Sequence, residues 1–577
     1  MRYHILATDY DGTLAHGGAV SQRTLDALKR LLGSGRKLVM VTGRELPDLQ
    51  RVFPHLDLFE LVVAENGALL YRPATKTTQQ LAPPPPPEFV AELRERGVGP
   101  MSVGEVVVAT WEPHSQTMLD AIRDLGLDLQ VIFNKGAVMA LPTGVNKASG
   151  LAAALRELKM SAHNAVGIGD AENDHSFMKL CEVSVAVANA LPSVKSTADV
   201  VTEGDHGDGA TELVDHLLRD DLASVAAQLA RRRLTFGDDA HGEVKLEPYG
   251  GCTLICGASA SGKSTVAKRL VESLREQAYQ FCLVDPEGDY ESLGGAVVVG
   301  KPSAAPSLDD ALQLLEDVGV NGVVCLTGVP ISDRPKYFVD LFAGLLKMRV
   351  RYGRPHWLVL DEAHHLMPAA WQPPNGLLPE HLRNVVLVTV HPELLSLEVL
   401  QRVTDVIAAG PTAPDILARL AEVRHVEIPA APAPRAPGEV LLWSERDGGC
   451  RLVRVRPPTE EHRRHTRKYA EGRLSAERSF YFRGRDKKLN LRAQNLIQFL
   501  ELAEGVDAET WEFHLHKGDY SKWFREHIKD EELANEAAEL EGRDLGERDK
   551  SLAKLRDAIG RRYTLPASPD VPVRGAE

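Results

Sequence analysis

Short apolar runs alternate with amphipathic stretches over residues 3–218. The strand-like runs include YHILATD, KLVMVTG, NAVGIGD and VSVAVAN, and the intervening SQRTLDALKRLLGSG has the apolar spacing of a helix. This alternation predicts βαβ units and a mostly parallel sheet, with ligands at the carboxyl ends of its strands. We therefore predict an α/β domain over residues 1–222. A run of prolines at 83–87 is too stiff for a helix or a central strand, and it indicates an inserted cap over residues 71–141.

A second α/β series follows a polar, arginine-rich stretch, residues 223–250, which we interpret as a linker. Its strand-like runs are CTLIC, FCLVD, GVVCLTG, HWLVLDE and NVVLVTV, and GEVLLW with RLVRVRP forms a terminal hairpin. This second domain covers residues 251–458. From 459 the chain is charged, with recurring Leu and Ala, which predicts a mainly helical module over 459–565 and a disordered tail over 566–577.

Composition narrows the classes of function. The 577 residues are 44% hydrophobic and 26% charged, which is typical of a folded globular protein. The net charge of −14 disfavours non-specific binding to nucleic acid, and for the basic run HRRHTRK, residues 462–468, a solvated linker face is the preferred interpretation. The six cysteines form no paired CxxC units, and the apolar pattern at the N-terminus leads us to expect neither a signal peptide nor a membrane anchor there. We expect a cytoplasmic protein with no membrane partner.

Two aspartates mark the end of the first apolar run. Asp9 and Asp11 flank Tyr10 in DYDGT, and the alternation of side chains in a strand places both carboxylates on one side of its carboxyl end. One such carboxylate can attack phosphorus while the other protonates the leaving oxygen. Taken alone, the motif is equally consistent with an acidic strand-end turn.

Three later motifs occur in a matching order: VTGR with Thr42 and Arg44, GVNK with Lys147, and GIGDAEND. With DYDGT they resemble the haloacid dehalogenase-like hydrolases, in their Cof-type or sugar-phosphatase branch, over residues 1–218. The resemblance implies a Rossmann-like core, a small phosphorylated metabolite as substrate, and Mg²⁺. It also implies that Asp9 is the nucleophile and Asp11 the general acid/base, that Thr42, Arg44 and Lys147 complete the catalytic set, and that the metal is held by Asp9, Asp11, Asp170, Asn173 and Asp174.

A phosphate-binding loop follows the strand CTLIC. The sequence GASASGKS matches GxxxxGK[ST] and precedes a helical pattern, so its backbone N–H groups are expected to wrap the phosphates of ATP. In this interpretation Lys263 reaches the β- and γ-oxygens and Ser264 binds Mg²⁺. The full expected nucleotide-binding set is Gly257, Ser259, Ser261, Gly262, Lys263, Ser264, Thr265, Asp285, Asp361 and His391.

The apolar run before Asp361 and Glu362 in WLVLDEAHHL supplies the second half of an ATPase. Asp361 is expected to hold Mg²⁺ and Glu362 to polarise the attacking water. Together with DPEGDYESL and LVTVHPE, these motifs resemble the HerA/FtsK-like ATPases. The resemblance implies a sensor for the γ-phosphate at Thr389 or His391 and a homo-oligomer, with a hexamer as the usual form. A buried, non-catalytic His391 is the alternative.

The C-terminal module contains the segment HLHKGDYSKWF, residues 514–524, through which it resembles helical modules of uncharacterised bacterial proteins. Its residues Trp511, His514, His516, Tyr520 and Trp523 have helical spacing, which favours a packed core over a ligand groove.

Three functions are compatible with these motifs. The first is a phosphatase fused to an ATPase that regulates or assembles it. The second is a nucleic-acid end-processing phosphatase and kinase, in which Asp285 deprotonates a hydroxyl group. The third is a nucleotide-dependent scaffold. The Asp361–Glu362 pair favours water activation, and therefore the first function.

Overall fold

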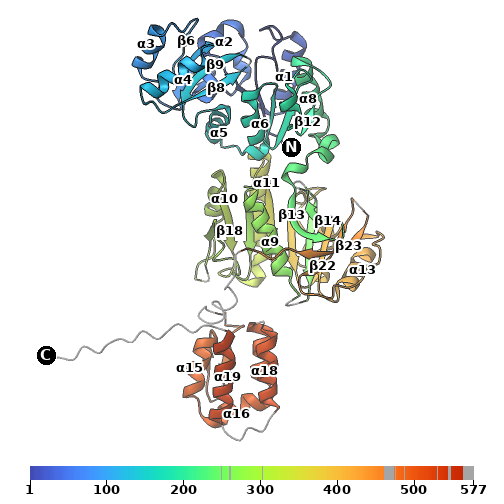
Figure 1. Ribbon diagram of the computed structural model, residues 1–577. Coiled ribbons are helices and arrows are strands. Elements are labelled where there is room, and N and C mark those ends of the chain that lie inside the picture. The colour runs from blue at the N-terminus through green and yellow to red at the C-terminus, as the bar shows by residue number, and fades with distance from the viewer. Residues whose placement is uncertain are drawn as a thin grey trace, which may run out of the picture.

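The computed structural model describes residues 1–134, 136–247, 250–258, 261–301, 303–446, 448–459, 474, 476–485, 488–528, 530–542 and 548–562. In Figure 1 an α/β domain that carries the N-terminus is followed by a second α/β domain and then by a group of helices. The basic run 462–468 and the expected tail 566–577 lie outside the described residues. Among the helices that are described, none combines the length and the apolar character needed to cross a membrane.

The first domain is built on a sheet of eight strands in the order β12-β11-β10-β1-β2-β3-β4-β5. Six strands are parallel: β1 (Ile5–Thr8), β2 (Lys37–Val41), β3 (Leu61–Ala64), β10 (Ala165–Gly169), β11 (Val183–Ala186) and β12 (Val200–Val201). The connecting helices are α1 (Gln22–Gly33), α2 (Leu46–Val52), α5 (Lys147–Glu157), α6 (His175–Leu180), α7 (Pro192–Lys195) and α8 (His206–Asp220). Strand β1 is buried throughout, so the expected parallel α/β core is confirmed.

The inserted cap is a separate antiparallel sheet in the order β6-β7-β9-β8. Its elements are α3 (Pro87–Glu95), β6 (Ser102–Val103), β7 (Val108–Trp111), α4 (Ser115–Asp124), β8 (Leu129–Asn134) and β9 (Ala137–Pro142). The expected start at residue 71 is wrong, because β4 (Leu69–Arg72) pairs antiparallel with β3, and β5 (Thr77–Gln80) pairs antiparallel with β4, so that both extend the main sheet. Edge strands that pair with the core have the same alternation as cap strands, so the sequence pattern does not separate them.

The second domain has a sheet of eleven strands in the order β14-β13-β23-β22-β21-β15-β20-β19-β16-β18-β17. Its parallel strands are β15 (Cys252–Gly257), β16 (Phe281–Asp285), β17 (Ala296–Val299), β18 (Asn321–Cys325), β19 (Trp357–Leu360), β20 (Val385–Thr389) and β21 (Val403–Ala409). Its helices are α9 (Lys263–Glu276), α10 (Leu308–Glu316), α11 (Arg334–Tyr352), α12 (Leu397–Leu400) and α13 (Ala413–Arg424). The predicted terminal hairpin is present as β22 (Glu439–Ser444) and β23 (Cys450–Val455).

The segment 223–250 is not a simple linker. Strands β13 (Leu234–Asp239) and β14 (Gly242–Leu246) form a hairpin, and β13 pairs with β23 at the edge of the second sheet. Leu234 and Phe236 are buried in the core of that domain. The arginines that suggested a linker serve the first domain instead, since the guanidinium group of Arg231 donates to the backbone carbonyl groups of Lys179 and Cys181.

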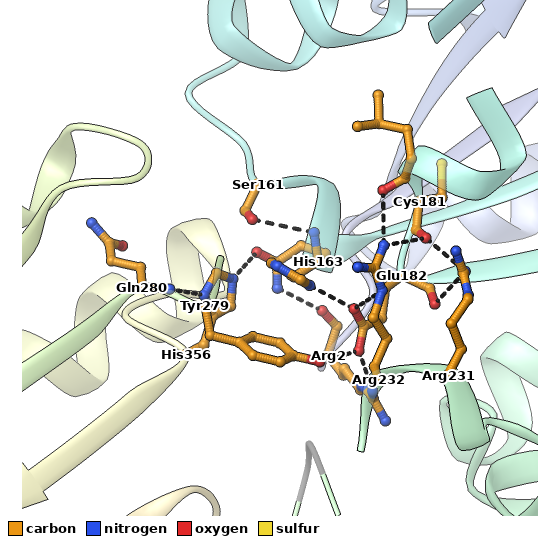
Figure 2. Close-up of polar contacts among 12 residues, drawn as sticks. Arg2, Ser161, His163, Cys181, Glu182, Arg231, Arg232, Tyr279, Gln280 and His356 are labelled. Carbon is orange, nitrogen blue, oxygen red and sulfur yellow. Dashed lines mark hydrogen bonds and ion pairs between the residues drawn. The ribbon is translucent and has the colours of Figure 1, made fainter. Parts of the chain in front are cut away.

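The two α/β domains meet through the amino ends of their strands. Glu182, directly before β11, is buried, and its carboxylate accepts a 2.7 Å hydrogen bond from the hydroxyl group of Tyr279, which lies before β16. On its own side, Glu182 contacts Nδ1 of His163 at 2.6 Å and Nη2 of Arg2 at 2.9 Å, as Figure 2 shows. The ring of His163 stacks on Tyr279 with centroids 4.0 Å apart. This contact is a buried, charge-compensated interface.

A second interface contact involves His356, directly before β19. Its Nδ1 accepts a 2.9 Å hydrogen bond from the backbone N–H of Gln280, so the proton of the neutral ring resides on Nε2. That Nε2 lies 3.2 Å from Oδ1 of Asn164, which precedes β10 of the first domain. Burial keeps the pKa of His356 well below its usual value, consistent with a neutral ring. Because the amino ends of the strands face each other, the carboxyl ends of the two sheets lie on opposite sides of the interface.

The C-terminal module comprises a two-stranded sheet, β24 (Phe480–Phe482) and β25 (Leu491–Ala493), with α15 (Leu496–Gly505), α16 (Ala508–Lys517), α17 (Asp519–Trp523), the π-helical turn η10 (Phe524–Ile528), α18 (Glu531–Glu541) and α19 (Arg548–Arg562). Trp511, Tyr520 and Trp523 are buried in one aromatic core, whereas His516 is exposed. The interpretation of these residues as core is therefore confirmed for Trp511, Tyr520 and Trp523 and is wrong for His516.

Candidate active sites

Lys147 lies between two carboxylates at the carboxyl edge of the first sheet. Its Nζ is 2.6 Å from Oδ1 of Asp9 and 2.6 Å from Oδ1 of Asp174, and all three side chains are buried. Lys147 begins α5 directly after Asn146, whose side chain accepts the backbone N–H groups of residues 148 and 149 and caps the helix. Burial lowers the pKa of the ammonium group, but the carboxylates of Asp174 and Asp9 outweigh burial and raise it above its usual value. The lysine is therefore charged.

Three carboxylates at this edge have the geometry of a cation site. Each of Asp9, Asp170 and Asp174 offers an oxygen within 4.8 Å of the others. The second oxygen of Asp174 accepts the backbone N–H groups of Asp170 and residue 171, both at 2.9 Å, which fixes this turn. Such an all-oxygen set suits Mg²⁺. Burial and the carboxylate of Asp174 raise the pKa of Asp9 against the opposing effect of Lys147, so a divalent cation would stabilise its ionised form.

Close backbone packing makes this turn. A Cβ atom on Gly169 would lie 2.6 Å from the Cβ of Asp174, so only glycine allows the carboxylate to fold back over the strand end. Thr13 also contributes, because its hydroxyl group donates a 3.1 Å hydrogen bond to Oδ1 of Asp170. Our sequence reasoning did not assign a role to Thr13, although it stands in the DYDGT motif.

The loop that carries Thr42 is tied to the turn after β3. Asn66, in the short 3-10 turn η2 (Glu65–Gly67), donates its backbone N–H to the carbonyl oxygen of Thr42 at 3.0 Å. The side chain of Asn66 accepts a 3.1 Å hydrogen bond from Nδ2 of Asn173. The structure therefore brings Thr42 and Asn173 into one neighbourhood through a residue that our sequence reasoning missed. The Asn-Gly pair after an apolar strand was the available signal.

Asp11 is engaged by Arg44. Nε and Nη2 of Arg44 donate to the two carboxylate oxygens of Asp11 at 2.6 and 2.7 Å, a bidentate pair. Nη1 of Arg44 also donates to Asp48. Asp9, Lys147 and Asp174 thus form a buried group, and Asp11, whose side chain is 45% exposed, forms a separate pair at its rim.

The second candidate site is the loop after β15. Gly257 has φ 147° and Gly262 has φ 100°, and a Cβ atom on Gly257 would lie 2.3 Å from the carbonyl oxygen of Ala409. Glycine is thus required at Gly257 by both conformation and space. Lys263 begins α9, and its Nζ donates to the carbonyl oxygen of Ala258 at 2.8 Å, within its own loop. Ser261, Ser264 and Thr265 lie beside it, and Ser259 lies outside the described residues.

Acidic side chains gather beside this loop at the ends of β16 and β19. Asp361 is buried, and burial, followed by the charges of Glu362 and Asp285, raises its pKa well above the usual value. A cation would relieve this repulsion, which fits an Mg²⁺ ligand. Asp285 instead accepts three backbone N–H groups, from Glu287, residue 288 and Tyr290, which indicates a role in shaping the turn.

Strand β20 lies between β15 and β19, so its end borders both halves of the candidate ATP site. Thr389 at this end is buried, and its hydroxyl group lies 3.0 Å from Nδ1 of His364. His391 is exposed and contacts Glu393 at 3.2 Å, so the alternative of a buried, structural His391 is wrong. Of the two candidate sensors, Thr389 is buried, whereas His391 is exposed and its ring lies 5.9 Å from that of His364.

The C-terminal module reaches this acidic edge. The guanidinium group of Arg478 pairs with the carboxylate of Glu287, and the backbone carbonyl of Arg478 accepts a 2.8 Å hydrogen bond from Nε1 of Trp523. The loop after β16 therefore contacts both the candidate ATP site and the C-terminal module.

Comparison with known proteins assigns the two α/β domains. Residues 6–98 and 100–213 match the haloacid dehalogenase-like hydrolase family, and residues 247–396 match an AAA domain. A phosphoglycolate phosphatase of Methanothermobacter thermautotrophicus is 30% identical over 217 residues, covering 36% of this chain and 96% of that protein. One from Halorubrum lacusprofundi is 31% identical over 223 residues, covering 37% and 96%. Phosphoglycolate phosphatase 2 of Saccharolobus solfataricus is 28% identical over 227 residues, covering 37% and 92%.

These relatives match the first domain over nearly their whole length, and the strands and motif residues described above fall within the matched range. The chain belongs to the haloacid dehalogenase-like hydrolases through its N-terminal domain, which is followed by an AAA-type P-loop domain.

Proposed function

We propose that the first domain hydrolyses phosphomonoesters through an aspartyl-phosphate formed on Asp9. The observation that carries the proposal is the position of Lys147, whose Nζ lies 2.6 Å from both Asp9 and Asp174 in a buried setting. The ammonium group holds the attacking carboxylate in place and offsets the negative charge of an approaching phosphoryl group. Thr42 and Lys147 hold the phosphoryl oxygens.

The general acid/base is Asp11, two residues after the nucleophile. During attack by Asp9 it protonates the leaving oxygen, and during hydrolysis it takes a proton from the incoming water. Arg44 orients Asp11 by its bidentate contact. Asp9, Asp170 and Asp174 would hold Mg²⁺, together with Asp11 and with Asn173 in an outer position. When bound, the cation screens the dianionic phosphate from the carboxylate nucleophile.

The substrate we propose is a small phosphorylated carboxylic acid of the phosphoglycolate type. Support comes from three similar proteins, all phosphoglycolate phosphatases, which match the first domain over more than nine-tenths of their length. Phosphate release from phosphoglycolate, sugar phosphates, nucleotides and 5′-phosphorylated oligonucleotides, measured with Mg²⁺ and with EDTA, tests this. We expect release from phosphoglycolate that needs Mg²⁺ and is lost in Asp9→Asn. Release only from oligonucleotides would contradict the substrate, and equal release by Asp9→Asn would contradict the mechanism.

We also propose that the P-loop domain hydrolyses ATP, in the manner of HerA/FtsK-like enzymes, and assembles or regulates the phosphatase. Lys263 and Ser264 would hold ATP and Mg²⁺, Asp361 would complete the metal shell, and Glu362 would polarise water. The buried interface at Glu182 and Tyr279 supports structural coupling between the domains. An ATPase assay tests the hydrolysis. Phosphatase rate and oligomeric state, each measured with and without nucleotide, test the regulation and the assembly.

The same assays also test the two other candidate functions, an end-processing kinase and a nucleotide-dependent scaffold. The three backbone hydrogen bonds to Asp285 leave little capacity for it to act as the base of an end-processing kinase. Transfer of labelled phosphate from ATP to a 5′-hydroxyl oligonucleotide would nevertheless overturn the ATPase assignment. If the parent chain is a nucleotide-dependent scaffold, it would bind ATP, and biological function would stay normal in both Asp9→Asn and Lys263→Ala.

A further inference from the structure

The turn after β3 contains a buried amide group that the proposed mechanism does not use. Asn66 is 1% exposed, with φ 56° and ψ 31°, the left-handed conformation that Asn adopts more readily than most residues. Its side-chain carbonyl is occupied by Asn173, but its Nδ2 has no hydrogen-bond partner among the described residues. Oδ1 of Asn173 is also without a partner there. In this orientation of the two amides, the unused donor belongs to Asn66 and the unused acceptor to Asn173.

Unused polar groups in a protein interior are costly. A buried donor without a partner costs about 1–3 kcal/mol, and such groups are rare enough to require a cause. Here the cost falls on a residue that is also held in the left-handed region. A substrate oxygen that accepts from this donor would remove the cost only when the site is filled.

The turn that contains Asn66 packs against the segments that carry the two proposed phosphate ligands. The backbone N–H of Asn66 is bonded to Thr42, one of the two proposed phosphate ligands. The next residue, Gly67, packs so tightly on the start of α5 that an added Cβ would lie 1.9 Å from the carbonyl oxygen of Asn146, the residue before Lys147. Asn66 is therefore fixed to the loop of one phosphate ligand and to the helix of the other.

The turn is also fixed to the cap. The buried carboxylate of Glu65 accepts the backbone N–H groups of Glu105, Val106 and Val107 at 2.9, 2.8 and 3.0 Å. An added Cβ on Gly104 would lie 2.7 Å from this carboxylate, so the cap loop approaches as closely as a glycine permits. These contacts hold the turn from both sides, and the amide of Asn66 does not need its own partner to stay in position.

We infer that Asn66 is a substrate-binding residue, whose side-chain amide donates a hydrogen bond to a phosphoryl oxygen of the phosphomonoester held by Thr42 and Lys147. The inference rests on the proposed phosphatase function and adds a third phosphate ligand to it. Because the contact is to the phosphoryl group, it serves every phosphomonoester equally, whatever its organic part.

Two substitutions test the inference. Asn66→Gly removes the amide and tolerates the positive φ, and Asn66→Asp keeps the shape but replaces the donor with a carboxylate that repels the phosphate. We expect Asn66→Gly to weaken binding of inorganic phosphate, measured by calorimetry with Mg²⁺, and to lower kcat/KM roughly 10- to 100-fold, as for a lost hydrogen bond to a charged group. The factor should be the same for phosphoglycolate and p-nitrophenyl phosphate. Asn66→Asp should lose more than Asn66→Gly.

Asn164→Asp is the matched control. Asn164 is equally buried, but it lies at the amino edge of the same sheet, where its amide donates to the carbonyl oxygens of Arg2 and Gly353. This variant should lose thermal stability and keep its affinity for phosphate. Unchanged phosphate affinity in both Asn66 variants, or an equal loss in Asn164→Asp, would overturn the inference. If the parent chain binds phosphate but hydrolyses no ester, the proposed function is wrong and the inference about Asn66 still stands. If the parent chain binds no phosphate, the proposed function and the inference are both wrong.

Discussion

The carboxyl edges of the two sheets differ in how their charges are balanced. In the first domain, Lys147 already lies between Asp9 and Asp174. In the second, Lys263 donates to a carbonyl oxygen of its own loop, and burial, followed by the charges of neighbouring acids, raises the pKa of Asp361. In the first site a lysine ammonium group therefore lies between two carboxylates, whereas in the second the lysine of the proposed nucleotide-binding loop contacts a carbonyl oxygen. A lysine on a helix N-terminus serves both, but its local partners differ.

The largest expected effect on activity comes from removing the ammonium group of Lys147. Lys147→Met leaves two buried carboxylates close together, and it removes the charge that offsets the phosphoryl group, so we expect phosphate release to fall about 1,000-fold. Steady-state kinetics with phosphoglycolate measure this. Lys37→Met, which breaks the half-exposed pair of Lys37 with Glu60 on the same sheet, is the control. Activity of Lys147→Met within tenfold of the parent would show that the pair is not catalytic.

The next effect tests whether the two edges are chemically independent. Lys263→Ala should reduce ATP hydrolysis about 100-fold, because the β- and γ-phosphates lose their cation. Without nucleotide, phosphate release by the first domain should stay within about twofold of the parent, since distant sites behave additively. Any change that ATP causes in the phosphate release of the parent should be lost in the variant. The exposed Lys347→Ala on α11 is the control. An equal effect of ATP on phosphate release in the parent and in Lys263→Ala would show that the P-loop does not regulate the first domain.

The interface itself has a pH signature. Burial raises the pKa of Glu182, but the hydrogen bond and charge of His163, with Arg2 and Tyr279, outweigh burial and lower it from 4.5 to about 2. Because the folded pKa is depressed, the carboxylate stabilises the fold fully above pH 4.5, and this contribution is lost as the pH falls toward 2. Glu182→Gln should therefore lower the free energy of unfolding by about 3 kcal/mol at neutral pH.

Urea unfolding of the parent and Glu182→Gln between neutral pH and about pH 3 measures this, and the difference between them should narrow on the acid side. Glu60→Gln is a control, because its half-exposed ion pair contributes about 1 kcal/mol or less. A difference that stays constant across this range would show that the charge of Glu182 does not carry the contact.

The smallest effect concerns the C-terminal module. Arg478→Ala removes one positive charge from beside Glu287 and the acidic cluster, so ATP should bind more weakly. The side chain of Arg478 is 31% exposed, which limits the change in KM for ATP to less than about fivefold. Arg485→Ala, an exposed arginine of the same module, should have no effect. Equal KM values for both variants would separate the module from the ATP site.

The motifs were readable from the sequence because each is local. Asp9, Lys147 and Lys263 stand at strand ends or helix starts that short patterns of apolar residues define. The hairpin of β13 and β14 was not readable as part of the second domain, because its partner strand pairs Gly237 with Val455, far along the chain. Strand pairing over such separations leaves no local pattern.

By itself, the sequence determined the order of the domains, the parallel sheets, and the chemical types gathered at their carboxyl edges, since periodicity and turn residues act over a few positions. Only the tertiary structure decided that the sheets meet at their amino edges, that Arg44 binds Asp11, and that Asn66 keeps a buried amide beside Thr42. These features depend on which surfaces pack together, and packing joins residues whose separation along the chain carries no signal.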